Sequence, residues 1–331
     1  MMTACKSRAR LNWALGAALV LLGPRPSQAW SLLTHRAINR MAAFSVPREM
    51  YPWYGYAGLL GELASGPDFW KSADPLEGPR HYINLETYGR TDHLPLEPVD
   101  GGVGQIHWVI LQLQHRLEQA FRSGDPELTV RLAAAQGHYV SDAHMPLHTT
   151  VNFNGWQTGN DGIHGLWEDE MALRAGREGF PVRQAAAAVE DVWQVIEQEI
   201  VTAYGRAPAI MRADDKARRM HERETDAYYA TLWQETAPLF REQVNAATRT
   251  LASLWYTAWV KAGRPAIAPP PAFVSTDSIH LAAPDLPPDQ TQPLPRPNWV
   301  LPALLLLAGL LLLVLGIKRP RHPASKKPRL L

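Results

Sequence analysis

The sequence predicts an all-α body that spans residues 30–263. Apolar residues recur at helical spacing along several stretches, and no run of alternating apolar and polar residues indicates a strand. No internal repeat is evident in the chain. One multi-helix domain is therefore the expected architecture.

Four stretches carry the helical pattern most clearly. The first covers Ile106–Phe121. Asp125 and Pro126 are typical of a helix start, and we expect the second helix to run from them toward His144. Two longer stretches share the same periodicity: Val182–Tyr204 and Ala237–Lys261.

Residues 1–29 have the features of a secretory signal peptide. Basic residues precede an apolar stretch from Leu11 to Leu22, and Ser27-Gln28-Ala29 puts small residues at the two positions that a signal peptidase reads. An uncleaved N-terminal anchor is the alternative, but the apolar stretch is shorter than the ~20 residues that a span needs. We therefore expect an exported chain that begins at Trp30.

The C-terminal part predicts a membrane anchor. Residues 299–317 are apolar and long enough to form a transmembrane helix, and six basic residues follow in the tail 318–331. This order predicts a cytoplasmic tail and a body on the periplasmic or extracellular side of the membrane. Residues 264–298 contain ten prolines and predict an extended stalk, with a strap lying on the body as the alternative for Phe273–Leu281.

Cysteine usage and charge limit the function classes. The single cysteine, Cys5, lies in the expected signal peptide, so the mature chain can have neither a disulfide framework nor cysteine-bound zinc. Ten of the 33 basic residues lie in the two ends, which leaves 23 against 32 acidic side chains and a net charge of −9. An acidic body argues against a large basic surface for nucleic acid.

Two His–carboxylate pairs predict a metal site. His138 and Asp142 stand four residues apart in an expected helix, so their side chains share one face. His164 and Glu168 repeat that spacing after a glycine-rich loop. Imidazole nitrogen and carboxylate oxygen are ligands that suit zinc. A single pair is more often a support within a helix, but two pairs close together favour metal binding.

Two more histidines flank the first pair. His148 follows Pro146, which should interrupt the helix. His144 stands only two residues from Asp142, so it should point elsewhere, either supporting the site or lying at the surface.

The remaining candidates lie nearer the N-terminus. His81 and Asp68 are possible ligands, with Asp74 as a competitor of Asp68. A cleaved chain would present the free amine and first carbonyl of Trp30, which can chelate a cation, and His35 follows closely.

In this order the motifs resemble the phospholipase C/P1 nuclease family. The resemblance covers about residues 30–175 and implies an all-α bundle. It also implies three zinc ions per chain, held by nine residues: Trp30, His35, Asp68, His81, His138, Asp142, His148, His164 and Glu168.

The family pattern divides these ligands among three sites. One zinc ion would take Asp68, His81, His138 and Asp142. A second would take the amine and carbonyl of Trp30 with His35, and would share Asp142. The third would take His148, His164 and Glu168. Asp68 is also the expected catalytic residue, as a proton acceptor.

The resemblance implies a zinc-dependent hydrolase that acts on phosphodiesters. Glu168 and the short step from His148 to His164 resemble the phospholipase C branch, which we favour. The Trp30–His35 spacing and Asn152–Gly155 resemble the S1/P1 branch of single-strand nucleases and 3′-nucleotidases. The substrate would be a phospholipid head group or a single-stranded nucleic acid.

A zinc-binding exported protein without turnover is a further alternative. Specificity residues are expected at Trp53–Tyr56 and Trp156.

Overall fold

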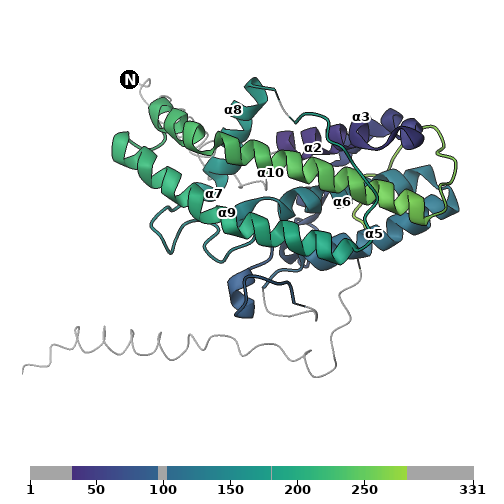
Figure 1. Ribbon diagram of the computed structural model, residues 1–331, viewed down its shortest axis with the longest axis horizontal. Helices are drawn as coiled ribbons and strands as arrows, with labels where there is room; N and C mark the ends of the chain where they lie inside the picture. Colours follow the sequence, from purple (N-terminus) through teal and green to yellow (C-terminus); the bar gives the residue numbers. More distant parts are fainter. Residues whose placement is uncertain (1–31, 96–102, 180, 282–331) are drawn as a thin grey trace, which may run out of the picture. The chain divides into compact units, whose positions relative to one another are not determined.

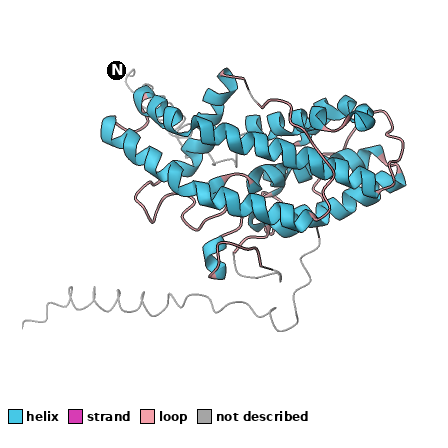
Figure 2. Ribbon diagram, in the orientation of Figure 1, coloured by secondary structure: helices cyan, strands magenta, loops and turns pink. Residues whose placement is uncertain are grey.

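The computed structural model describes residues 32–95, 103–179 and 181–281. These residues form helices joined by loops and contain no strand, apart from an isolated bridge between Ile83 and Gly104 (Figure 2). The predicted all-α body is confirmed. Within the described ranges no helix is long and apolar enough to cross a membrane. The expected signal peptide, Trp30, the predicted transmembrane helix and the basic tail lie outside those ranges.

The two longest helices form an antiparallel hairpin. α9 (Val192–Met220) and α10 (Asp226–Lys261) are joined by a short turn and run side by side (Figure 1). Asp191 and Thr225 occupy the N-cap positions of the two helices, where each side chain accepts a hydrogen bond from a backbone N–H of the first turn.

Three further helices pack against α10 and complete the core. They are α2 (Leu32–Ser45), α5 (Ile106–Ser123) and α6 (Pro126–Ala143). Every residue of α6 from Leu132 onward is buried, on all sides of the helix. A polar side chain on this helix therefore has to meet a partner inside the protein.

Shorter elements connect these helices and carry much of the candidate site. They are η2 (Arg48–Tyr56), α3 (Ala57–Leu63), α4 (Gly66–Trp70), η3 (Gly78–His81), η4 (Leu85–Tyr88), η5 (Pro146–His148), α7 (Ile163–Gly165), the π-helix η6 (Leu166–Glu170) and α8 (Met171–Arg177).

The helix predicted at Val182–Tyr204 begins only at Val192. Residues 181–191 are not helical, and three of their backbone N–H groups bond to side chains instead. Those of Ala187 and Val189 donate to hydroxyls of Ser253 and Thr257 on α10. These hydroxyls replace the helical partners, so apolar periodicity alone placed the helix start ten residues too early.

Residues 264–281, which we call the C-terminal strap, lie on the helical body. The Tyr56 hydroxyl donates to the Ala268 carbonyl at 2.8 Å, and the indole N–H of Trp70 donates to the Thr276 carbonyl at 3.3 Å. Ile279 and Leu281 are buried. These contacts place residues 264–281 on the body, where the sequence favoured a free stalk from residue 264, and for Phe273–Leu281 they agree with the alternative of a strap. The rest of the expected stalk, residues 282–298, lies outside the described residues.

The strap can bind to the body despite its prolines because its backbone still offers carbonyl oxygens. Its carbonyl groups point outward from the chain and can accept hydrogen bonds even where proline removes the N–H donors. The body supplies those donors from aromatic and arginine side chains.

Candidate metal centre

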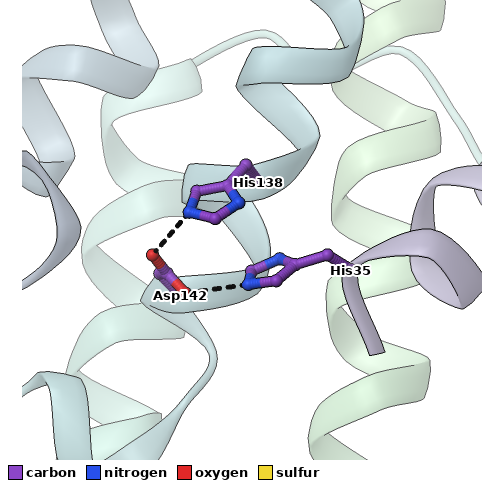
Figure 3. A group of neighbouring side chains, drawn as sticks. All are labelled: His35, His138 and Asp142. Atoms are coloured by element: carbon purple, nitrogen blue, oxygen red, sulfur yellow. Dashed lines mark ion pairs between the residues drawn. The ribbon is translucent and has the colours of Figure 1, made fainter. Parts of the chain in front are cut away.

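Side chains from several elements converge on one face of α6. His138 and Asp142 stand one turn apart on that helix, and His35 reaches them from α2 (Figure 3). Asp68 comes from α4 and His81 from the end of η3. The chain therefore brings together candidates that lie more than one hundred positions apart in the sequence.

Close packing of α2 on α6 places His35. A Cβ added at Gly137 would lie 2.1 Å from Asn39 Oδ1, so a larger residue there would have to displace the Asn39 side chain. Asn39 Nδ2 donates to the carbonyls of Leu60 and Ala134, each at 3.1 Å, and so joins α2 to two other helices. His35 lies one turn before Asn39 and is completely buried.

Asp142 is the shared carboxylate of the cluster. One of its oxygens, Oδ1, lies 3.5 Å from His35 Nε2 and 3.4 Å from His148 Nδ1. The other, Oδ2, lies 2.9 Å from His81 Nδ1 and 3.3 Å from His138 Nε2. The rings of His35 and His138 stack at 4.0 Å.

Three groups of side chains could each hold a metal ion. They are His35 with His138 and Asp142, Asp68 with His81 and His138, and His148 with His164 and Glu168, and within each group the candidate ligand atoms lie within 4.8 Å of one another. In the third group the two Nε2 atoms are 3.2 Å apart, and each lies 3.0 Å from an oxygen of Glu168.

The sequence left a choice between Asp68 and Asp74. Asp68 Oδ1 lies 3.8 Å from both His81 Nδ1 and His138 Nε2. Asp74 instead accepts a hydrogen bond from Arg80 at 2.9 Å. The structure therefore brings Asp68 into the cluster and leaves Asp74 outside it.

His144 is buried, so a place at the surface is wrong. Its Nδ1 lies 2.7 Å from the Val140 carbonyl, and its Nε2 lies 3.5 Å from Glu199 Oε2. It points away from the cluster, as its spacing from Asp142 predicts.

Buried polar atoms of the cluster test whether these residues fit a metal ion. Several of them make no hydrogen bond with any described residue: His35 Nδ1 and Nε2, Asp68 Oδ2, Asp142 Oδ1, His148 Nδ1, His164 Nδ1 and both oxygens of Glu168. Leaving such an atom unsatisfied costs about 1–3 kcal/mol. Bound cations would coordinate several of these atoms, and the nitrogen and oxygen donors match the preferences of zinc.

The pKa shifts of two candidate ligands suit metal binding, whereas burial would lower the pKa of His138 and His148 but the charge of Asp142 raises both. Burial would raise the pKa of Glu168, but the charges and close contacts of His164 and His148 outweigh it and lower the pKa to about 2. Burial, reinforced by the charge of His138, lowers the pKa of His35 to about 3. An ionised carboxylate and a neutral imidazole are the forms that bind a metal.

Two residues of the site escaped the sequence analysis. Lys71 Nζ donates to Asp68 Oδ1 at 2.8 Å. Glu77 is buried and lies 3.2 Å from His81 Nε2. Glu77 stands four residues before His81, the spacing that drew attention to the other two pairs, so this signal was present in the sequence.

A cavity of about 440 Å³ opens beside the cluster. Its lining includes Lys71, Tyr82, Phe153 and three of the candidate ligands, His81, His148 and His164. This volume lies in the range of small-molecule sites.

Of the predicted specificity residues, Trp156 lies near this cavity and is 61% exposed. Its ring meets Phe153 edge-on at 5.0 Å. Trp53 is fully buried and stacks on Tyr56 in the core, so the prediction that it contacts the substrate is wrong.

No protein-family profile matches the chain, and no curated protein matches its sequence.

Proposed function

We propose that the chain is a zinc-dependent phosphodiester hydrolase of the phospholipase C/P1 nuclease type, with its catalytic domain outside the cytoplasm. One observation carries the proposal: three adjoining His–carboxylate groups, with buried atoms that lack hydrogen bonds, lie beside a cavity that His81, His148 and His164 line. Clustered metal sites beside a cavity are typical of enzymes that hydrolyse phosphate esters.

The proposed metal content is three zinc ions. The groups found among the described residues contain eight of the nine residues that the family assignment names, and they place His138 beside His35 as well as beside Asp68 and His81. The ninth ligand, Trp30, would complete the His35 site and lies outside the described residues. When bound, zinc supplies Lewis acidity and lowers the pKa of water.

The chain's own residues would bind and orient the substrate. Lys71 carries a positive charge into the wall of the cavity and would attract the phosphate group. Asp68, held by Lys71 at 2.8 Å, leaves its second oxygen without a hydrogen bond to any described group, and that oxygen would accept a proton. Phe153 and Trp156 would contact the rest of the substrate.

Phospholipase C-type hydrolysis is the first candidate, because Glu168 and the short His148–His164 step resemble that branch. The exposed ring of Trp156 beside Phe153 favours the second candidate, a single-strand nuclease or 3′-nucleotidase, because a nucleobase can stack on such a surface.

Parallel assays on one preparation test both candidates. The purified protein is given bis-p-nitrophenyl phosphate, phosphatidylcholine vesicles, single-stranded DNA, RNA and 3′-nucleotides, with and without a zinc chelator. We expect chelator-sensitive hydrolysis of the small phosphodiester and of phosphatidylcholine. Cleavage of nucleic acid without action on lipid would select the nuclease. Tightly bound zinc with no hydrolysis of any substrate would support the alternative of a zinc-binding exported protein without turnover.

A further inference from the structure

A buried chain of hydrogen bonds connects the metal cluster with the C-terminal strap. It begins at His81, whose Nδ1 faces the cluster and whose Nε2 lies 3.2 Å from Glu77 Oε1. Arg80 Nη1 donates to the other oxygen of Glu77 at 2.7 Å. Arg80 Nη2 donates to the Leu281 carbonyl of the strap at 3.1 Å. Two side chains thus join a candidate ligand to a segment two hundred positions away.

Glu77 holds the ring of His81 from the side away from the cluster. A carboxylate at Nε2 would keep the proton on that nitrogen when a metal ion takes the Nδ1 lone pair. The Tyr139 hydroxyl donates to the same carboxylate oxygen.

Arg80 is nearly fully buried, and its guanidinium is divided among three partners. Besides Glu77 and the strap, it donates to Asp74 at 2.9 Å. A buried guanidinium that loses a partner retains a desolvated donor, which is costly. The position of Arg80, and therefore of Glu77, depends on the docked strap.

Other contacts hold the strap without this connection. Arg131 donates to the Asp277 carbonyl at 2.8 Å. Unlike Arg80, Arg131 makes no hydrogen bond with Glu77 among the described residues, so it binds the strap without reaching His81. On the strap itself, Leu281 is 3% exposed and Phe273 is 78% exposed. The chain therefore offers matched controls for both ends of the link.

We propose that Glu77 and Arg80 are positioning residues for His81, and that docking of the strap at Leu281 raises the affinity of the His81 site for its metal ion. This inference rests on the proposed zinc-dependent function. The C-terminal strap, which precedes the expected membrane anchor, would then contribute to metal binding at the His81 site.

The test measures metal binding in the full-length chain. Zinc affinities come from competition with a chromophoric chelator, and the absorption spectrum of the cobalt-substituted protein reports the ligands at each site. Arg80→Lys, Glu77→Gln and Leu281→Asp should each weaken one site by about 10–100-fold and change its cobalt spectrum. Arg131→Lys and Phe273→Asp should change neither. Because Arg80 and Leu281 act through one contact, the double variant should be no weaker than the worse single variant.

Wild-type affinity in Arg80→Lys and in Leu281→Asp would overturn the inference. An equal loss in Arg131→Lys would also overturn it, because the strap would then act only through general stability. Zinc binding that follows the expected pattern in a protein without hydrolytic activity would support the inference and refute the proposed function. A wild-type protein that binds no zinc would refute both.

Discussion

At the scale of single residues, Asp142 stands out because four histidines surround one carboxylate. His35 and His148 approach one oxygen, and His81 and His138 approach the other, all at 2.9–3.5 Å. Burial would raise the pKa of Asp142, but the charges and hydrogen bonds of these histidines hold it well below the usual range. Asp142 is therefore ionised, and its two oxygens face two different pairs of histidines.

Asp142→Asn should remove zinc from the two sites that the residue is proposed to share. The amide has no charge and one fewer acceptor oxygen, so the affinity of both sites should fall by at least ~100-fold. Metal analysis after dialysis against a weak chelator measures the zinc that remains. Phosphodiester hydrolysis should be lost in parallel.

Asp214→Asn is the matched control. Asp214 is equally buried, but its partners are Tyr228, Asn160 and Arg218 rather than histidines. Its replacement should lower the melting temperature and leave zinc in the two sites that Asp142 is proposed to share, with any loss confined to the third group through the bond with Asn160. Equal zinc loss in both variants would mean that Asp142 acts only through stability.

Glu199 gives a pH dependence that is separate from the metal cluster. Burial would raise the pKa of Glu199, but its contacts with His144, Arg249 and Thr250 outweigh this effect and lower the pKa to about 2. A carboxyl whose pKa is lower in the folded state stabilises the fold above its unfolded pKa, about 4.5. That contribution is lost as the pH falls from about 4.5 to about 2.

Glu199→Gln should therefore flatten the pH dependence of the free energy of unfolding between about pH 4.5 and about pH 2. The expected difference from wild type is about 1–2 kcal/mol at neutral pH, after allowance for the partial exposure of the side chain. Urea unfolding at several pH values measures it, with both proteins saturated with zinc. Parallel curves for the two proteins over that window would contradict the assignment.

At the scale of elements, the sequence predicted best where local rules decide the outcome. The HxxxD spacing on α6, the break at Pro146 and the helix start at His164 follow from nearby residues alone. The spacing of Glu77 from His81 was visible, but its bond with Tyr139, which lies 62 positions away, was not. The start of α9 was missed because hydroxyls on α10 satisfy the preceding backbone. Tertiary contacts, which periodicity does not reveal, decided both cases.

The loop 151–162 is the element that delivers His164. Asn160 is buried and ties this loop to α9, with its Nδ2 lying 3.2 Å from the Met211 carbonyl, 2.7 Å from Asp214 and 2.9 Å from Asp215. Gly162 then adopts a φ of 82° immediately before α7, a conformation that favours glycine. The loop is thus fixed at its end nearest the metal cluster.

Asn160→Ala should destabilise the protein and weaken the third metal group. Loss of the amide leaves buried acceptors without a donor, which costs about 1–3 kcal/mol. Urea unfolding measures the stability, and chelator competition measures the zinc affinity. Asn152→Ala, which removes a bond to Thr158 within the same loop, should stay within about 0.5 kcal/mol of wild type. Equal effects of the two changes would refute the anchoring role of Asn160.

At the scale of the whole molecule, the C-terminal strap changes where the functional unit ends. The helical body and the strap residues 264–281 belong to one compact unit. Ile279 and Leu281 are buried against that body, and arginines from three elements donate to strap carbonyls: Arg80 from η3, Arg116 from α5 and Arg131 from α6. A proline-rich composition therefore does not by itself mark a linker, because extended chain still offers carbonyl acceptors.

Truncation at two positions should distinguish the role of the strap from that of the expected membrane anchor. A chain that ends after residue 286 keeps every described contact of the strap, so it should be soluble, hold its full zinc content and hydrolyse a small phosphodiester at the wild-type rate. A chain that ends after residue 263 loses the burial of Ile279 and Leu281, worth about 1.5–3 kcal/mol each, and leaves Arg80 without its strap partner. It should melt at a lower temperature and lose zinc first from the His81 site. Melting curves and metal analysis of the two proteins decide the matter, and equal stability with equal zinc content would show that the strap only covers the surface.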